Sequence, residues 1–159
     1  MVALGQPAPD FELSNQDNQL IRLSSLRGRK VVLFFFPKAN EFSFGCIAQA
    51  CAFRDESDDL KEAGAVVFGI SADVPKALKG WGENHRIKYD LLSDAGFKVH
   101  ALYGTQMNVL GGVSLPWTNR SYFVIDENGV IVDMEVGSGP IESAKKALEA
   151  VRKLNAAAV

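Results

Sequence analysis

The chain has 159 residues, of which 47% are hydrophobic and 23% charged, and its formal net charge is -2. This length and apolar content suffice for one core, so we predict a single domain over residues 1–159. A nearly neutral balance without basic or acidic blocks argues against nucleic acid or a membrane surface as a partner. No stretch is long and apolar enough to span a membrane. We expect a cytoplasmic protein, or one of a reducing organelle if a targeting peptide has been removed.

The first part of the chain predicts an extended arm and a small hairpin. Pro7 and Pro9 favour extended backbone. Asp10–Leu13 and Leu20–Leu23 flank a polar turn and predict two paired strands. Residues 24–28 end in glycine and predict a turn or a single helical turn.

A buried strand and an amphipathic helix follow. Val31–Phe36 is a run of apolar residues that stops at Pro37, which is typical of a strand buried on both faces and predicts the central strand. Beyond a turn-rich segment, residues of one helix face recur at helical spacing: Cys46, Ala50, Phe53, Ser57 and Leu60. Gly64 predicts the end of this helix.

Cys46 falls at the first turn of the predicted helix. Unpaired backbone N–H groups and the helix dipole favour a negative charge there, so we expect a depressed thiol pKa and a nucleophilic thiolate. Arg54 and Arg120 are candidates for further cationic support.

Cys51 follows Cys46 by five residues, which in an unbroken helix separates the two Cα atoms by roughly 8 to 9 Å. A disulfide needs less than about 7 Å, so the pair favours a reversible disulfide that forms when the helix unwinds.

The second half alternates strands and helices. Strands are predicted at three places, the last a hairpin around an Asn-Gly turn: Ala65–Ser71, Tyr89–Ser93, and Ser121–Ile125 with Val130–Val136. Helices are predicted over Val74–Arg86, over Gly96–Tyr103 and after Gly139, the last with Pro140 in its first position and Ile141, Ala144, Leu148, Val151 and Leu154 on one face. Residues 104–116 predict a glycine-rich loop. This order predicts an α/β fold with a central mixed β-sheet flanked by helices.

The stretch around Cys46 resembles the peroxiredoxins, and among them the peroxiredoxin Q group, also called bacterioferritin comigratory proteins. That group has an apolar strand followed by P-K-x-x-T-P-G-C-T-x-x-A-C-x-F-R-D. With Ser43 in the place of the threonine, the chain matches at Pro37, Lys38, Gly45, Cys46, Ala50, Cys51, Phe53, Arg54 and Asp55. The likeness continues in GQPAPDFEL, VVFGISAD, YDLLSD and SYFVIDENGVI. It implies a thioredoxin-like fold with the peroxiredoxin-type N-terminal extension.

The resemblance also implies a function and the roles of five residues. Cys46 would be the peroxidatic cysteine, Cys51 the resolving cysteine, Ser43 and Arg120 would orient the peroxide, and Pro37 would shield the thiol. The chain would reduce hydrogen peroxide and alkyl hydroperoxides through a Cys46–Cys51 disulfide that a thioredoxin-like donor recycles. It would act as a monomer without a metal or another cofactor.

Two segments depart from the group's pattern. Five residues separate Pro37 from Ser43 where the group has three, and the segment 115–120 is about two residues longer as well. The two insertions either compensate each other or mark a changed substrate pocket. Two alternatives to the peroxidase stay open: a thiol–disulfide oxidoreductase that uses the same pair, and a redox-sensing binding module without efficient turnover.

Other conspicuous residues have plainer interpretations. His85 and His100 share no ligand spacing, so we expect surface residues and no metal site. We predict that Trp81 packs in the core and that Trp117 packs in a loop. Asp55, with Arg54, either supports the active site or simply belongs to the polar face of the helix.

Overall fold

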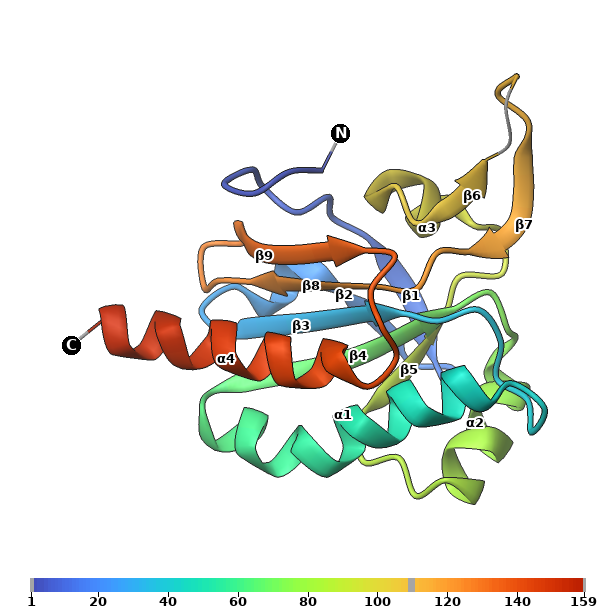
Figure 1. The fold of residues 1–159 in the computed structure, drawn as a ribbon, viewed down its shortest axis with the longest axis horizontal. Coiled ribbons are helices and arrows are strands. Elements are labelled where there is room, and N and C mark those ends of the chain that lie inside the picture. The colour runs from blue at the N-terminus through green and yellow to red at the C-terminus, as the bar shows by residue number, and fades with distance from the viewer. Residues whose placement is uncertain (1, 109–110, 159) are drawn as a thin grey trace.

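The computed structural model describes residues 2–108 and 111–158, and most of its strands form one mixed sheet (Figure 1). The sheet has seven strands in the order β2-β1-β5-β4-β3-β8-β9. Their bounds are β1 (Glu12–Asn15), β2 (Leu20–Arg22), β3 (Lys30–Phe35), β4 (Ala65–Ser71), β5 (Asp90–Ser93), β8 (Ser121–Ile125) and β9 (Ile131–Val136). Strands β3, β4 and β5 are parallel, whereas β8 runs antiparallel to β3. The predicted mixed sheet is confirmed.

The helices cover both faces of this sheet. They are the 3-10 turn η1 (Leu23–Leu26), α1 (Phe44–Glu62), α2 (Pro75–Asn84), α3 (Lys98–Tyr103) and α4 (Glu142–Ala157). Helices α1, α2 and α4 contribute to the core on one face. The N-terminal arm, η1 and α3 contribute to the core on the other. Figure 1 shows α1 and α4 side by side along the sheet.

Strand β3 supplies both cores because its side chains alternate between the two faces. Phe34 lies on the α1 side, where its ring stacks on Phe53 at 4.3 Å between centroids. Phe35 lies on the other side, among the rings of Tyr103 and Phe123. Both side chains are fully buried, and burial of one such side chain stabilises the fold by roughly 1.5–3 kcal/mol. The apolar run therefore forms a strand buried on both faces, as predicted.

The glycine-rich loop predicted at residues 104–116 is wrong in part. Strand β6 (Gln106–Asn108) pairs antiparallel with β7 (Ser114–Thr118) in a separate two-stranded sheet. Gly111 and Gly112 both have positive φ, at 97° and 80°, a backbone conformation that glycine adopts more readily than other residues. This explains the glycines in the connection between the two strands. Residues 109–110 of the predicted loop lie outside the described residues.

The predicted start of the last helix is also wrong by two residues. Helix α4 begins at Glu142 and Pro140 belongs to the preceding turn, where the Ser143 hydroxyl donates to the Gly139 carbonyl at 2.6 Å. The Ser143 N–H reaches the same carbonyl only at 3.4 Å, longer than a regular helical hydrogen bond, so Pro140 and Ile141 form a turn before the helix. Ile141 consequently caps the helix and is 57% exposed instead of packing on its apolar face.

Candidate active site

Cys46 is the third residue of α1 and is buried, with 2% of its surface exposed. In the first turn of a helix the backbone N–H groups have no partner within the helix, and the helix dipole adds a partial positive charge. Ser43 is the residue that precedes the helix, and its carbonyl accepts the Ile47 N–H at 3.0 Å. The predicted placement of Cys46 at a helix start is confirmed.

Arg120 contacts the Cys46 sulfur, although 74 residues separate the two in the sequence. Its Nη2 lies 3.7 Å from Cys46 Sγ, and its Nη1 donates to the Gly45 carbonyl at 3.1 Å and to Gln49 Oε1 at 2.8 Å. The residue lies in the short link between β7 and β8, and its own carbonyl accepts the N–H groups of Gly137 and Ser138. The structure thus places a fixed cation against the sulfur of Cys46.

Gln49 is a residue of this site that the sequence analysis missed. It is fully buried, one turn after Cys46, and it positions Arg120 through its side-chain oxygen. Its Nε2 has no hydrogen-bond partner among the described residues. A glutamine on the buried helix face that also carries Cys46 was the available signal, since an uncharged amide in a core needs a polar partner.

Pro37 and Ser43 both lie on the segment between β3 and α1. Pro37 follows the end of β3 by two residues and is half-buried, as Ser43 is. Ser43 makes no side-chain capping hydrogen bond to the helix. Their roles toward a peroxide stay predictions.

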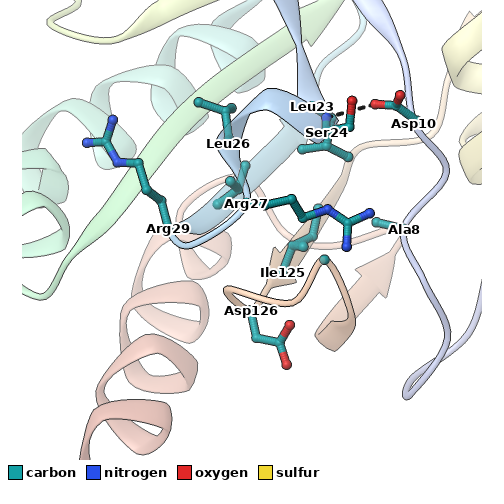
Figure 2. A pocket seen from close by; sticks show the side chains of 11 residues that line it. Ala8, Asp10, Leu23, Ser24, Leu26, Arg27, Arg29, Ile125 and Asp126 are labelled. Atoms are coloured by element: carbon teal, nitrogen blue, oxygen red, sulfur yellow. Dashed lines mark hydrogen bonds between the residues drawn. The ribbon is translucent and has the colours of Figure 1, made fainter.

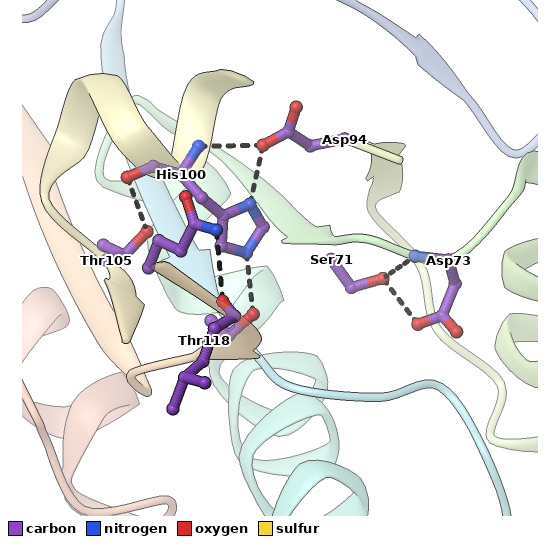
Figure 3. A network of polar contacts seen from close by, with 8 residues as sticks. Ser71, Asp73, Asp94, His100, Thr105 and Thr118 are labelled. Atoms are coloured by element: carbon purple, nitrogen blue, oxygen red, sulfur yellow. Dashed lines mark hydrogen bonds and ion pairs between the residues drawn. The ribbon is translucent and has the colours of Figure 1, made fainter. Parts of the chain in front are cut away.

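Asp73, two residues after β4, anchors this segment, and Figure 3 shows its contacts with Ser71. Its Oδ2 accepts the Ala39 N–H and the Ser71 hydroxyl, both at 2.8 Å, and the carboxylate is 9% exposed. The Lys38 ammonium lies 3.7 Å from its Oδ1. The loop that leads to Cys46 is therefore fastened to the neighbouring strand by a buried carboxylate.

Cys51 lies in the same helix as Cys46, and both cysteines are free. It is half-buried, and this burial raises the pKa of its thiol, an effect that the nearby Arg54 opposes and Asp55 reinforces. The Arg54 guanidinium donates to Asp55 at 3.0 Å and to the His85 carbonyl at 2.8 Å. The cation that the structure directs to Cys46 is thus Arg120, while Arg54 belongs to the surroundings of Cys51.

The prediction that His100 is a surface residue is wrong. Its side chain is fully buried, with Nδ1 2.6 Å from Asp94 Oδ2 and Nε2 2.8 Å from the Thr118 hydroxyl (Figure 3). Burial raises the pKa of Asp94, but hydrogen bonds from His100 and the Val99 N–H outweigh this effect, so the pKa is lowered. The sequence could not show this, because the network joins a loop after β5, helix α3 and strand β7.

His85 is also less exposed than predicted. Its imidazole packs against Trp81 and lies 2.9 Å from a Glu41 carboxylate oxygen. Trp81 is buried as predicted, whereas Trp117 is 59% exposed on strand β7. Within residues 2–108 and 111–158, no cluster of three or more His, Cys, Asp or Glu residues could hold a metal ion.

A small pocket lies away from these residues (Figure 2). Its lining includes Ala8 and Asp10 of the N-terminal arm, Leu23 and Arg27 near η1, and Gly129 of the β8–β9 turn. The volume is about 10 Å³, which is about the space that one water molecule needs. This pocket is too small to be a substrate site.

Comparisons with known proteins identify the family. The model of the AhpC/TSA family matches residues 4–134. The chain belongs to the AhpC/TSA family. Relatives of this AhpC/TSA chain include a chloroplastic peroxiredoxin Q of Populus jackii, 41% identical over 127 residues that make up 80% of this chain and 57% of the relative. A putative peroxiredoxin bcp of Coxiella burnetii is 37% identical over 82% of this chain and 85% of its own length. This sequence therefore spans little more than half the length of its plant relatives.

A solved structure matches nearly the whole fold. The crystal structure of peroxidoxin BcpB from Mycobacterium tuberculosis has a TM-score of 0.86 and 35% sequence identity, and the match covers 97% of this chain and 99% of that one. The predicted thioredoxin-like fold and the resemblance to the peroxiredoxin Q group are thereby confirmed. None of the described helices combines the length and the apolar character needed to cross a membrane.

Proposed function

We propose that this chain is a thiol-dependent peroxidase that reduces hydrogen peroxide and alkyl hydroperoxides. The observation that carries the proposal is the Cys46 sulfur at the start of α1 with the Arg120 guanidinium 3.7 Å away. The N-terminus of the helix and the guanidinium can both stabilise the negative charge that develops when a peroxide bond breaks. Relatives named peroxiredoxin Q and peroxiredoxin bcp support the same activity.

In the first step, the Cys46 thiolate attacks the distal oxygen of the hydroperoxide. A sulfur–oxygen bond forms, the oxygen–oxygen bond breaks, and the departing alkoxide or hydroxide takes up a proton. Cys46 is left as a sulfenic acid. Arg120 and the helix N–H groups stabilise the departing charge, Ser43 orients the peroxide, and Pro37 shields the thiol from water.

In the second step, Cys51 attacks the Cys46 sulfenic acid. A disulfide forms, the sulfur–oxygen bond breaks, and the hydroxyl leaves as water with the Cys51 proton. Because five residues of helix separate the two cysteines, α1 must open locally for this step. A thioredoxin-like dithiol then reduces the disulfide by two thiol–disulfide exchanges. The enzyme acts as a one-domain monomer in a reducing compartment.

The burial of Cys46 favours the peroxidase over a thiol–disulfide oxidoreductase. With 2% of its surface exposed, the sulfur admits a small peroxide more readily than the disulfide of a protein substrate. Efficient turnover distinguishes the peroxidase from a redox-sensing binding module.

One equivalent of hydrogen peroxide added to the reduced protein tests the proposal by intact mass and stopped-flow fluorescence. We expect rapid loss of two hydrogens in the parent, a sulfenic acid that a trapping reagent captures in Cys51→Ser, and no reaction in Cys46→Ser. Steady turnover with a thioredoxin system should follow in the parent alone. If the parent reacts no faster than a free thiol, the peroxidase proposal is wrong.

A further inference from the structure

Tyr89 joins the start of β5 to the part of α1 that carries Cys51. Its hydroxyl donates to the Ala50 carbonyl at 2.7 Å, across 39 residues of sequence. In a continuous α-helix, that carbonyl also accepts the Arg54 N–H. A carbonyl oxygen has two lone pairs and can accept both bonds. The tyrosine therefore fastens one peptide group of α1, between Ala50 and Cys51, to the segment that leads into β5.

The surroundings keep Tyr89 in this position and in its donating form. Its ring meets Phe34 edge-on at 5.6 Å, and Phe34 in turn stacks on Phe53 of α1. Burial raises the pKa of its phenol well above the ordinary value, and the neighbouring Cys51 raises it further. The hydroxyl thus stays protonated at neutral pH and lies beside the second cysteine.

The same peptide group must move when a Cys46–Cys51 disulfide forms. The Cα atoms of the two cysteines lie roughly 8 to 9 Å apart in a regular helix and must approach to less than about 7 Å. The turn between them has to unwind, and this rotates the Ala50–Cys51 peptide away from Tyr89. Arg54, which donates to the His85 carbonyl at 2.8 Å, holds the next turn of the helix in place. The unwinding is thereby confined to the turns before Arg54.

We propose that Tyr89 is a positioning residue whose hydroxyl holds the Cys51 turn of α1 closed and thereby sets the rate of disulfide formation. This inference rests on the proposed function. In the step that it controls, the Cys51 sulfur bonds to the Cys46 sulfur and water leaves with the Cys51 proton, so no further oxidant is needed. While the turn stays closed, the sulfenic acid persists and a second peroxide can oxidise it to the sulfinic acid. Tyr89 therefore also sets the peroxide concentration at which the enzyme is inactivated.

The variant Tyr89→Phe removes the hydroxyl and keeps the ring against Phe34. We expect the disulfide to form about three- to tenfold faster, the effect of losing one net hydrogen bond that only the closed helix makes. The rate at which peroxide oxidises Cys46 should stay within about twofold of the parent, because Tyr89 does not touch the sulfur. Sulfinic acid should appear only at higher peroxide concentration. Stopped-flow fluorescence resolves the two rates, and intact mass reports the sulfinic acid.

Tyr103→Phe is the matched control. Tyr103 is a buried tyrosine whose hydroxyl donates to the Pro9 carbonyl at the same distance of 2.7 Å, away from α1. It should lose a comparable bond while both rates stay at the parent's values. If Tyr89→Phe forms the disulfide at the parent's rate, or if both variants accelerate it equally, the proposed role of Tyr89 is wrong.

Amide hydrogen exchange of the reduced proteins tests the opening of α1 without peroxide. Amides of residues 47–54 should exchange about three- to tenfold faster in Tyr89→Phe than in the parent or in Tyr103→Phe. Diamide, which couples thiols without a sulfenic acid, should also close the disulfide faster in Tyr89→Phe. If peroxide does not react with the parent, the peroxidase proposal is wrong, but the role of Tyr89 is still tested. Amide exchange and diamide coupling both measure the opening of α1 without peroxide. Unchanged exchange and unchanged diamide coupling would overturn the proposed role of Tyr89.

Discussion

Gly45, the residue before Cys46, leaves room for the Arg120 guanidinium. A Cβ atom at this position would lie 2.9 Å from Arg120 Nη2, closer than the two atoms can approach. The guanidinium would have to move away from the Cys46 sulfur, and it is the cation that the structure places there. Glycine at position 45 thus allows a close approach and does not serve an unusual backbone conformation.

We predict that Gly45→Ala separates activity from stability. Oxidation of Cys46 by peroxide should slow by about tenfold or more because the displaced cation stabilises the departing charge less well. The free energy of unfolding should stay equal or rise slightly, since alanine favours helix over glycine. Stopped-flow oxidation and urea unfolding measure the two effects. Gly80→Ala in α2 is the control, because nothing lies within 4 Å of an added Cβ there and its oxidation rate should not change. Parent-like oxidation of Gly45→Ala would contradict the prediction.

The sequence indicates the roles of some site residues and not of others. Cys46 and Arg120 were paired in advance by the family resemblance, and the structure brings them into contact although 74 residues separate them. Sequence reasoning misses Gln49 and misassigns His100, because each has a polar partner in another element: Arg120 for Gln49 and Thr118 of β7 for His100. Periodicity indicates which side chains are buried, but it does not indicate which polar groups meet inside the core.

Among the elements, the segment between β3 and α1 depends on the carboxylate of Asp73. We predict that Asp73→Ala lowers the free energy of unfolding by about 1–3 kcal/mol, because the Ala39 N–H and the Ser71 hydroxyl lose their acceptor. Oxidation of Cys46 should slow as well, since the loop that carries Ser43 is released. Urea unfolding and stopped-flow oxidation test both effects.

Two other variants of the same anchor separate its contributions. Asp73→Asn keeps one acceptor oxygen and should fall between the parent and Asp73→Ala. Lys38→Ala removes an ammonium that is 62% exposed and 3.7 Å away, so it should change stability by less than about 1 kcal/mol. If Asp73→Ala behaves like Lys38→Ala, the anchor does not hold the loop.

The elements themselves were predictable where their pattern is local. Strands β4 and β8 have the predicted bounds, because a continuous apolar run between polar or glycine residues is a strong signal. The β6–β7 hairpin was not found, since its strands are short and largely exposed and pair only with each other. The late start of α4 depends on a side-chain bond within the preceding turn, which a helical pattern does not reveal.

At the scale of the whole molecule, the sheet topology brings the site together. Strands β3 and β4 are parallel, so the loop after β3 and Asp73 after β4 lie at one edge of the sheet. Strand β8 is antiparallel to β3, with Ser121 opposite Phe35, so Arg120 reaches this edge from the start of its strand. Three distant segments therefore converge on the first turn of α1. The directions of neighbouring strands bring these segments together, and a local sequence motif does not reveal this arrangement.

The whole molecule also determines how its tyrosines ionise. The chain has three tyrosines, and burial raises the pKa of Tyr89, Tyr103 and Tyr122 above the ordinary value. The Asp133 carboxylate, which accepts the Tyr122 hydroxyl at 2.8 Å, raises the pKa of Tyr122 further. The folded chain therefore keeps three protons that the unfolded chain releases above about pH 10. Since the unfolded state then binds fewer protons, stability falls as pH rises, by about 1.4 kcal/mol per pH unit for each tyrosine.

We consequently predict that the tyrosines ionise only when the chain unfolds. Between about pH 9 and pH 12, absorbance at the phenolate band should rise in one step that coincides with the loss of far-ultraviolet circular dichroism. The chain in concentrated urea should titrate gradually near pH 10, the ordinary value for tyrosine. In Tyr103→Phe, only two tyrosines lose a proton on unfolding. The free energy of unfolding should therefore fall less steeply with pH than in the parent, and for a given stability at pH 7 the variant should unfold at a higher pH. A phenolate signal near pH 10 from a chain whose circular dichroism is intact would show that at least one tyrosine is accessible to solvent, and would contradict the burial on which this argument depends.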